Sequence, residues 1–196
     1  EKLEKKLSKT KKSKLPKILI VVHLAGNPVD MKSIKKLSNK YKFKIIEDAS
    51  HALGSSIGKK KVGSCHYSDI TVFSFHPVKT ITSAEGGMMT TKNKIFYEKS
   101  ILFREHGIVR NKRKFITTKN ILPTHYEQHV LGFNYRLSEI HSALGISQLG
   151  NIKKIIRKRM ENTSFYKKKL INNNLKFQKV EKNNISANHL TIIRVN

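Results

Sequence analysis

The feature that most constrains this chain is a short connection between two extended segments that contains a lysine. Residues 69–73 are β-branched and aromatic, so they predict a buried strand. Pro77 lacks a backbone donor and ends that strand, and residues 88–91 resume an extended pattern after the Gly86–Gly87 pair. Lys79 therefore lies between two strands. A lysine held away from water there is more easily neutral and nucleophilic.

A carboxylate and a hydroxyl are predicted beside this lysine. Residues 44–48 predict a strand that ends on Asp48, and Ser74 directly follows the strand at 69–73. Functional groups in open α/β sheets gather at the carboxyl ends of strands. These three groups would make a pyridoxal phosphate site. The carboxylate would keep the pyridine nitrogen protonated, the hydroxyl would bind the phosphate, and the lysine would form a Schiff base. The alternative interpretation is that the three residues have ordinary structural roles: Asp48 caps the chain and Ser74 ends a strand. Lys79 would then be solvated, as most of the 40 lysines and arginines in the chain are expected to be.

The order of elements predicts an α/β fold. Residues 17–22 read as a buried strand that ends at His23, a residue that either lines the site or is structural. Asp30 is placed to cap a helix whose apolar face is formed by Ile34, Leu37 and Tyr41. Strand, helix and strand in succession imply a right-handed parallel crossover, and hence a mostly parallel central sheet flanked by helices.

The second half of the chain is more irregular. Residues 93–103 predict a helix, whereas residues 108–125 are charged and aperiodic and predict a mobile loop. Residues 137–170 are helical in pattern, with a break near Gly150, and residues 187–193 predict a strand.

Several motifs in a fixed order resemble one family, the DegT-type sugar aminotransferases. They are residues 46–54 (IEDASHALG), 73–79 (FSFHPVK), 85–87 (EGG), 104–107 (REHG), 126–128 (YEQ), 131–137 (LGFNYRL) and 143–149 (ALGISQL). Members of this family are fold-type I pyridoxal phosphate enzymes that act on nucleotide-linked keto-sugars. Within the family, the amino-acid sequences of these motifs most resemble the branch that acts in pseudaminic acid synthesis.

The resemblance implies a role for each residue of the cofactor site. Lys79 would form the Schiff base and then shuttle a proton, and Asp48 would pair with the pyridinium nitrogen. Ser74 would bind the phosphate, and His51 would lie beside the ring, where many members have glutamine. Asn134 would reach across a homodimer to the phosphate in the partner's site.

The resemblance also implies substrates and domains. His76 and Arg136 are candidate substrate contacts. The expected reaction moves an amino group from L-glutamate to C4 of a UDP-linked 4-keto-6-deoxy-N-acetyl-hexosamine, and the alternative is another nucleotide keto-sugar, 3-keto or dTDP-linked. Residues 1–150 would form the cofactor-binding domain, without its N-terminal part, and residues 151–196 a connecting helix and the start of a small α+β domain. The chain is thus expected to be a fragment.

Composition limits the remaining function classes. The formal net charge of +27 raises the alternative of a basic nucleic-acid-binding module. The lysines are scattered through every predicted element, however, and no nucleic-acid-binding motif is present, so no specific nucleic-acid partner is expected. One cysteine, Cys65, excludes an internal disulfide and fits a reducing compartment. With no long apolar run and no signal-peptide pattern, we expect a cytoplasmic protein without membrane contact.

Overall fold

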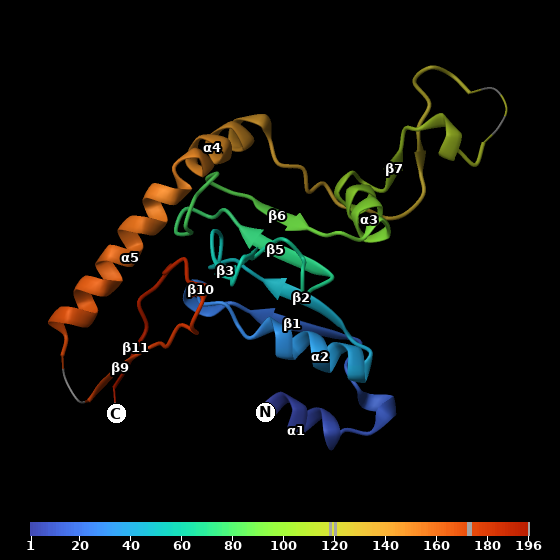
Figure 1. Ribbon diagram of the computed structural model, residues 1–196. Coiled ribbons are helices and arrows are strands. Elements are labelled where there is room, and N and C mark those ends of the chain that lie inside the picture. The colour runs from blue at the N-terminus through green and yellow to red at the C-terminus, as the bar shows by residue number, and fades with distance from the viewer. Residues whose placement is uncertain (118, 120, 172–173, 196) are drawn as a thin grey trace. The chain divides into compact units, whose positions relative to one another are not determined.

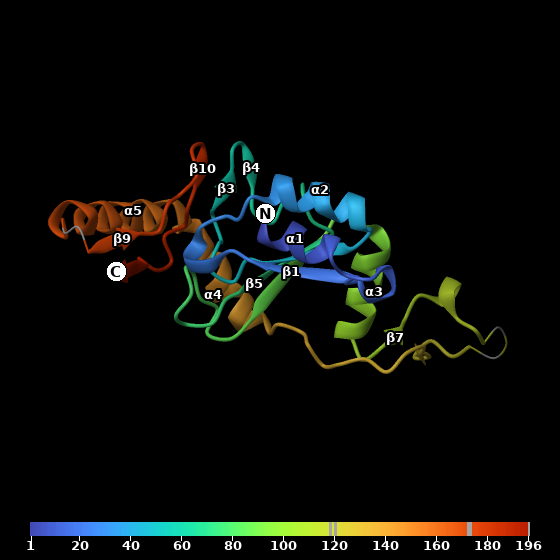
Figure 2. The ribbon, with the colours of Figure 1, turned by 90° about the horizontal axis from the view of Figure 1, so that it is seen from below.

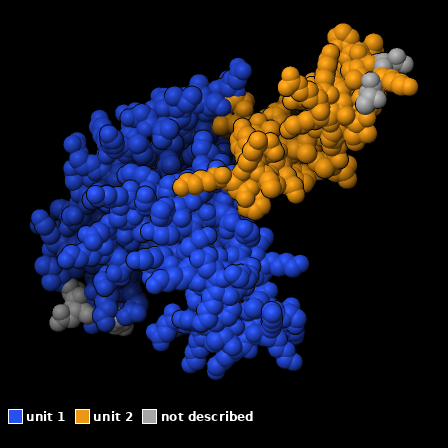
Figure 3. Space-filling model, turned by 45° about the vertical axis from the view of Figure 1, so that its right-hand side comes forward, with its two compact units in different colours: residues 1–91, 139–196 blue, residues 92–138 orange. Residues whose placement is uncertain are grey.

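The structure is a computed structural model of the chain, and it describes all residues except 118, 120, 172–173 and 196. The chain divides into two compact units, coloured separately in Figure 3. Unit 1 comprises residues 1–91 and 139–196, and unit 2 comprises residues 92–138. The predicted boundary at residue 150 falls between two helices of unit 1, and it stays a prediction.

A four-stranded sheet is the centre of unit 1. Its strands, in spatial order, are β1 (Ile18–Val22), β2 (Lys44–Asp48), β5 (Ile70–Ser74) and β6 (Gly87–Thr90). The first three are parallel and β6 is antiparallel to β5, so that the β6 arrow points the opposite way in Figure 1. The predicted α/β class with a mostly parallel sheet is confirmed.

The helix α2 (Met31–Tyr41) connects β1 to β2 and covers one face of the sheet. Figure 2 shows it running alongside β1. Its N-terminus is capped as predicted, because the Asp30 carboxylate accepts a hydrogen bond from the backbone N–H of Ser33 at 3.1 Å. At its other end Lys42 takes a left-handed conformation with φ of 61°. That residue turns the chain directly into β2.

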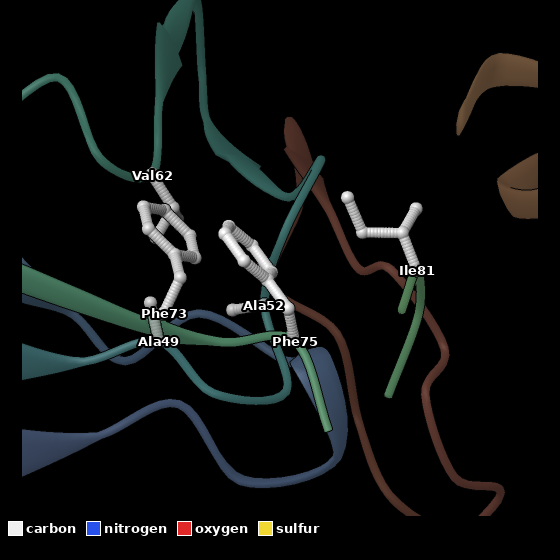
Figure 4. Packing of buried hydrophobic residues seen from close by; sticks show 6 residues of the cluster. All are labelled: Ala49, Ala52, Val62, Phe73, Phe75 and Ile81. Atoms are coloured by element: carbon white, nitrogen blue, oxygen red, sulfur yellow. The ribbon is translucent and has the colours of Figure 1, made fainter. Parts of the chain in front are cut away.

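The core lies on the face of the sheet that α2 covers. One cluster joins the sheet to α2 and to α1 (Lys2–Ser8), and its buried members are Leu7, Val21, Met31, Phe43 and Ile45. A second cluster, shown in Figure 4, is formed mainly by residues of the loops that follow β2 and β5; its buried members are Ala49, Ala52, Val62, Phe73, Phe75 and Ile81. The helix α5 (Ile152–Lys169) packs on this second cluster through Ile152 and Ile155.

The opposite face of β1 differs from the prediction of a buried strand. Ile18, Ile20 and Val22 are 53%, 62% and 48% exposed. Side chains alternate between the two faces of a strand, so these three residues share the face that α2 does not cover. A strand that is apolar on both faces is expected to be packed against other elements on both faces. The described residues pack only against the face of β1 that α2 covers.

The remaining elements of unit 1 are short, apart from α4. They are η1 (Lys12–Lys14), η2 (Leu24–Gly26), β3 (Ser56–Ile57), β4 (Lys60–Lys61), α4 (Glu139–Gly150), β9 (Leu175–Phe177), β10 (Asn184–Ile185) and β11 (Ile193–Val195). The predicted break in the long helix is confirmed, since α4 ends at Gly150 and α5 begins at Ile152.

The predicted strand at 187–193 is wrong, because only Ile193 belongs to a strand. The backbone donors of this segment bind loops instead of a neighbouring strand. The N–H of Ala187 donates to the Gly26 carbonyl and to the Ser55 hydroxyl, and the N–H of His189 donates to the Ala25 carbonyl.

The described residues of unit 2 form one α-helix, a short 3-10 helix and two short strands. They are α3 (Lys94–Arg104), β7 (Ile108–Val109), η3 (Lys112–Lys114) and β8 (Glu127–Gln128), with β7 and β8 paired antiparallel. The predicted helix at 93–103 is confirmed with a shift of one residue, and Asn93 caps it. The segment at 108–125, expected to be irregular, includes β7 and η3; residues 118 and 120 lie outside the described residues. Every helix among the described residues is too short or too polar to cross a bilayer.

Candidate active site

Two of the predicted site residues lie on one face of the sheet at the carboxyl ends of parallel strands. Val22, Asp48 and Val72 are register partners on β1, β2 and β5, so their side chains share a face. Ser74 is two residues beyond Val72 and therefore lies on that same face. This is the face that α2 leaves open, so a ligand has access to Asp48 and Ser74.

Asp48 is a half-buried carboxylate held in place by the residue two positions on. Its Oδ1 atom accepts hydrogen bonds from the backbone N–H of Ser50 at 3.0 Å and from the Ser50 hydroxyl at 2.6 Å. Burial alone would raise the pKa of Asp48, but the Ser50 hydrogen bonds and the positive charges of His51 and Lys79 together outweigh burial. The pKa lies below its ordinary value, so Asp48 is ionised at neutral pH.

Lys79 lies in the loop between β5 and β6, as predicted. Its backbone N–H donates to the His76 carbonyl at 2.9 Å, and the loop is closed by the N–H of Ser83, which donates to the Phe75 carbonyl at 2.9 Å. The side chain is half-buried. Its positive charge lowers the pKa of Asp48. It also lowers the pKa of His51, so these three predicted site residues lie within range of one another's charges.

His51 is held by a backbone donor. The N–H of Ala25 donates to the His51 Nδ1 atom at 3.3 Å, so Nδ1 is the acceptor and a neutral ring carries its proton on Nε2. Burial lowers the pKa of His51, the charge of Lys79 adds to this, and Asp48 opposes it. The imidazole is therefore mostly neutral at pH 7.

His189 is a site residue that the sequence did not reveal. Its ring lies against His51, with centroids 4.4 Å apart and planes tilted by 32°. Burial is the main cause that lowers the pKa of His189 to about 4. The charges of nearby cationic groups, among them Arg159 and Lys79, lower it further. The sequence around residue 189 contains no pattern that indicates this role. The role arises from contacts with Ala25 and His51, which are far away in the sequence.

His23 is structural rather than part of the site. It is fully buried, and its Nε2 atom lies 2.8 Å from the Glu47 carboxylate. The Nδ1 atom accepts from the backbone N–H of Val29 at 3.2 Å, so both ring nitrogens have a partner. The structure therefore supports the interpretation of His23 as a structural residue, not as a residue that lines the site.

Of the other predicted residues, Ser74 is half-buried, His76 is exposed, and Asn134 and Arg136 lie in unit 2. Ser74 accepts a long hydrogen bond of 3.4 Å from the N–H of His76, whose side chain is exposed. Asn134 and Arg136 belong to unit 2. There the Asn134 side-chain oxygen accepts from Arg136 at 3.2 and 3.3 Å, and Arg136 lies 3.9 Å from Glu105.

The groups assembled in unit 1 fit pyridoxal phosphate. An ionised carboxylate is required at the pyridine nitrogen, and Asp48 meets this requirement with its Oδ2 atom, which makes no hydrogen bond to the described residues. The Lys79 amine and the Ser74 hydroxyl supply the nucleophile and a phosphate ligand. His51 offers a neutral ring whose Nε2–H points to no other described partner.

Comparison with known proteins agrees with this chemistry. A transaminase of Campylobacter jejuni subsp. jejuni serotype O:23/36 (strain 81-176), named for UDP-4-amino-4,6-dideoxy-N-acetyl-beta-L-altrosamine, is 44% identical over 153 residues, which are 78% of this chain and 38% of the relative. The solved structure of Helicobacter pylori PseC, an aminotransferase of pseudoaminic acid biosynthesis, matches with a TM-score of 0.78 and 35% identity over 90% of this chain and 45% of that one.

A third match bears on the cofactor. The sugar aminotransferase Spr1654 of Streptococcus pneumoniae, described as putative and solved in a PLP form, matches with a TM-score of 0.78 and 25% identity over 91% of this chain and 48% of that one. Pyridoxal phosphate is the cofactor that these matches indicate. The chain spans less than half the length of these relatives. The model of the DegT/DnrJ/EryC1/StrS aminotransferase family matches residues 1–196, and the chain belongs to that family.

Proposed function

We propose that the protein is a pyridoxal phosphate-dependent aminotransferase that moves an amino group from L-glutamate to C4 of a UDP-linked 4-keto-6-deoxy-N-acetyl-hexosamine. The observation that carries the proposal is the cluster of Asp48, His51 and Lys79 at the strand ends, in a chain of an aminotransferase family. The name of the Campylobacter relative supports the sugar, because it describes a 4-amino-4,6-dideoxy sugar linked to UDP. The pathway would be pseudaminic acid or related surface-sugar synthesis in the cytoplasm.

Asp48 and Lys79 have the central roles. When bound, pyridoxal phosphate supplies an electron-withdrawing ring that stabilises negative charge on the carbon that loses a proton. The Asp48 carboxylate accepts a hydrogen bond from the ring nitrogen and keeps that nitrogen protonated. The Lys79 Nζ atom would hold the cofactor, and its amine would then carry the proton that leaves the α-carbon of the donor amino acid to C4′ of the cofactor.

The remaining residues bind and orient. His51 donates from Nε2 to an oxygen of the cofactor, and the Ser74 hydroxyl binds the phosphate. Asn134 donates to the phosphate in the partner's site of a homodimer, a hydrogen bond that the acceptor's charge strengthens. His76 and Arg136 contact the sugar nucleotide or the donor amino acid; Arg136 suits a carboxylate or phosphate, because its guanidinium presents paired donors.

The domain arrangement is part of the proposal. Residues 1–150 belong to the cofactor-binding domain, and residues 151–196 connect it to a small C-terminal domain. The segment at 187–191 supports a functional link between the two, because it packs on the loop that follows β1 and brings His189 to the site.

The test is cofactor binding by the purified protein and by variants at Lys79. Pyridoxal phosphate should bind with a near-visible absorbance band that Lys79→Ala abolishes and Lys79→Arg does not restore, since guanidinium is not nucleophilic at neutral pH. Lys59→Ala is the matched control, because Lys59 is an exposed lysine in the turn between β3 and β4. A protein that takes up no cofactor, or a Lys79→Ala variant that keeps the band, would overturn the proposal.

The sugar is tested separately, because the cofactor residues are shared by aminotransferases for other nucleotide keto-sugars. Glutamate is supplied with competing UDP-linked 4-keto, UDP-linked 3-keto and dTDP-linked 4-keto sugars, and the aminated product is identified by mass spectrometry. We expect the UDP-linked 4-keto sugar to be aminated first. Preference for a dTDP-linked or 3-keto sugar would replace the substrate and leave the chemistry in place.

A further inference from the structure

We propose that His189 is a positioning residue of the active site: its buried ring fixes the orientation of the His51 imidazole and keeps that imidazole neutral. The inference rests on the proposed function, because His51 matters as a cofactor-binding group. His189 is only 8% exposed, and its ring centroid lies 4.4 Å from that of His51. Its Nδ1 atom is buried and has no hydrogen-bond partner among the described residues. The His189 ring therefore acts on His51 by packing against it, not through a hydrogen bond from Nδ1.

Two hydrogen bonds join both histidines to the backbone of Ala25. The N–H of His189 donates to the Ala25 carbonyl at 2.9 Å, and the N–H of Ala25 donates to the His51 Nδ1 atom at 3.3 Å. One peptide segment therefore sets the positions of both histidines. Ala25 is buried and left-handed, with φ of 61°, a conformation that costs an L-residue free energy unless its surroundings require it.

The helix α5 anchors His189 from the other side. The guanidinium of Arg159 donates to the His189 carbonyl at 2.9 Å, and the Thr163 and Thr191 hydroxyls are 3.1 Å apart. The segment is thus fixed between α5 and the loop that follows β1. The His189 ring cannot withdraw from His51 without breaking one of these contacts.

This arrangement leaves His51 with one ring donor that has no partner among the residues the structure describes. Its Nδ1 atom is engaged by Ala25, so the Nε2–H is available for an oxygen of the cofactor. The charges of Lys79 and Asp48 act on His51, and the charged form of His51, Arg159 and Lys79 lower the pKa of His189. A second positive charge on His189 would repel the cationic groups around it, and burial keeps His189 neutral at pH 7. A neutral ring in this place excludes water from His51 and adds no charge.

The first measurement is made without cofactor, on the full chain labelled with ¹⁵N at histidine. NMR spectra of the imidazole nitrogens give the tautomer of His51 and its titration midpoint. In His189→Ala we expect the midpoint of His51 to rise by roughly one pH unit, because water reaches the ring, and the preference for the Nε2–H tautomer to weaken. His189→Phe keeps a flat apolar ring at the same place, so it should hold the midpoint near the wild-type value.

Two controls separate positioning from loss of structure. Thr191→Val removes one of the two contacts between the segment and α5 but keeps the Arg159 and Ala25 hydrogen bonds to His189, so the His51 ring stays covered and the His51 signals should stay unchanged. The signals of His23, held by Glu47 and Val29, report whether the sheet remains folded in each variant. His189→Gln repeats the test with less lost volume if His189→Ala disturbs His23.

The second measurement is the dissociation constant of pyridoxal phosphate from absorbance titration. We expect about tenfold weaker binding in His189→Ala, the lower end of the loss seen when a residue that orients a metal ligand is removed, and recovery in His189→Phe. If wild type binds the cofactor and His189→Ala changes neither the His51 signals nor the affinity, the inference is wrong and the proposed function stands. If wild type binds no cofactor, the proposed function fails, and the His51 signals alone decide whether His189 positions that ring.

Discussion

At the scale of single residues, Glu47 is a buried charge, among the described residues, that the active site does not use. Glu47 is 3% exposed, and its carboxylate accepts hydrogen bonds from the Ser68 hydroxyl, from Thr71 at 3.2 Å and from His23 at 2.8 Å. Burial alone would raise the pKa of Glu47, but these hydrogen bonds outweigh burial and hold the pKa below its ordinary value. The network ties β1, β2 and β5 together directly beneath the site residues at their ends.

This network predicts a pH-dependent contribution to stability. A carboxyl whose pKa is lower in the folded state than in the unfolded state stabilises the fold above the unfolded pKa, and that contribution is lost as the pH falls through the folded pKa. Glu47→Gln should therefore lower the free energy of unfolding at pH 7 by about 1–3 kcal/mol, with a smaller deficit below pH ~4. Urea unfolding at both pH values measures the difference.

The control for this variant is Glu4→Gln. Glu4 pairs with Lys40 at 3.4 Å, and both side chains are more than half exposed, so its loss should leave stability unchanged. A deficit for Glu47→Gln that is equal at neutral and acidic pH would show that the ionised state of Glu47 contributes nothing.

At the scale of elements, α2 shows how a helix is fixed at its start by one side chain. Asp30 accepts hydrogen bonds from the backbone N–H and the hydroxyl of Ser33, and these bonds lower the pKa of Asp30. Removing the side-chain cap leaves a backbone donor without its partner at the first turn. Asp30→Ala should cost about 1 kcal/mol of stability, whereas Asp30→Asn, which can accept the same bond, should cost little.

Thermal unfolding of both variants checks the cap. Equal losses for Asp30→Ala and Asp30→Asn would point to the charge at the helix N-terminus rather than to the hydrogen bond.

These elements also show what a single sequence reveals. The strand at residues 44–48 and the helix after Asp30 were predictable, because local patterns and a capping residue define both. The placement of Asp48 and Ser74 on one face needs the register of β2 against β5 in addition to strand alternation, and the structure provides that register. The role of His189 was not predictable, since it depends on contacts with Ala25 and His51, far away in the sequence. The exposed face of β1 was missed for the same reason: periodicity reports which residues are apolar, not what covers them.

At the scale of the whole molecule, the site residues fall in different parts of the chain. Asp48, His51, Ser74 and Lys79 belong to unit 1, and Asn134 belongs to unit 2. In the proposed homodimer, each site would take Asn134 from the other subunit to bind the cofactor phosphate. Closed two-fold symmetry makes the two sites equivalent.

Subunit mixing tests this arrangement. A Lys79→Ala homodimer lacks the nucleophile in both sites, and an Asn134→Ala homodimer retains the cofactor poorly, so each is inactive at limiting pyridoxal phosphate. A mixed dimer combines both lesions in one site and leaves the other intact. Equal amounts of the two variants, exchanged at random, should recover about a quarter of the wild-type activity, since half the dimers are mixed and each has one intact site. Subunit exchange is verified by mass spectrometry of differently tagged chains. Complete exchange without recovered activity would mean that each subunit builds its phosphate site from its own residues.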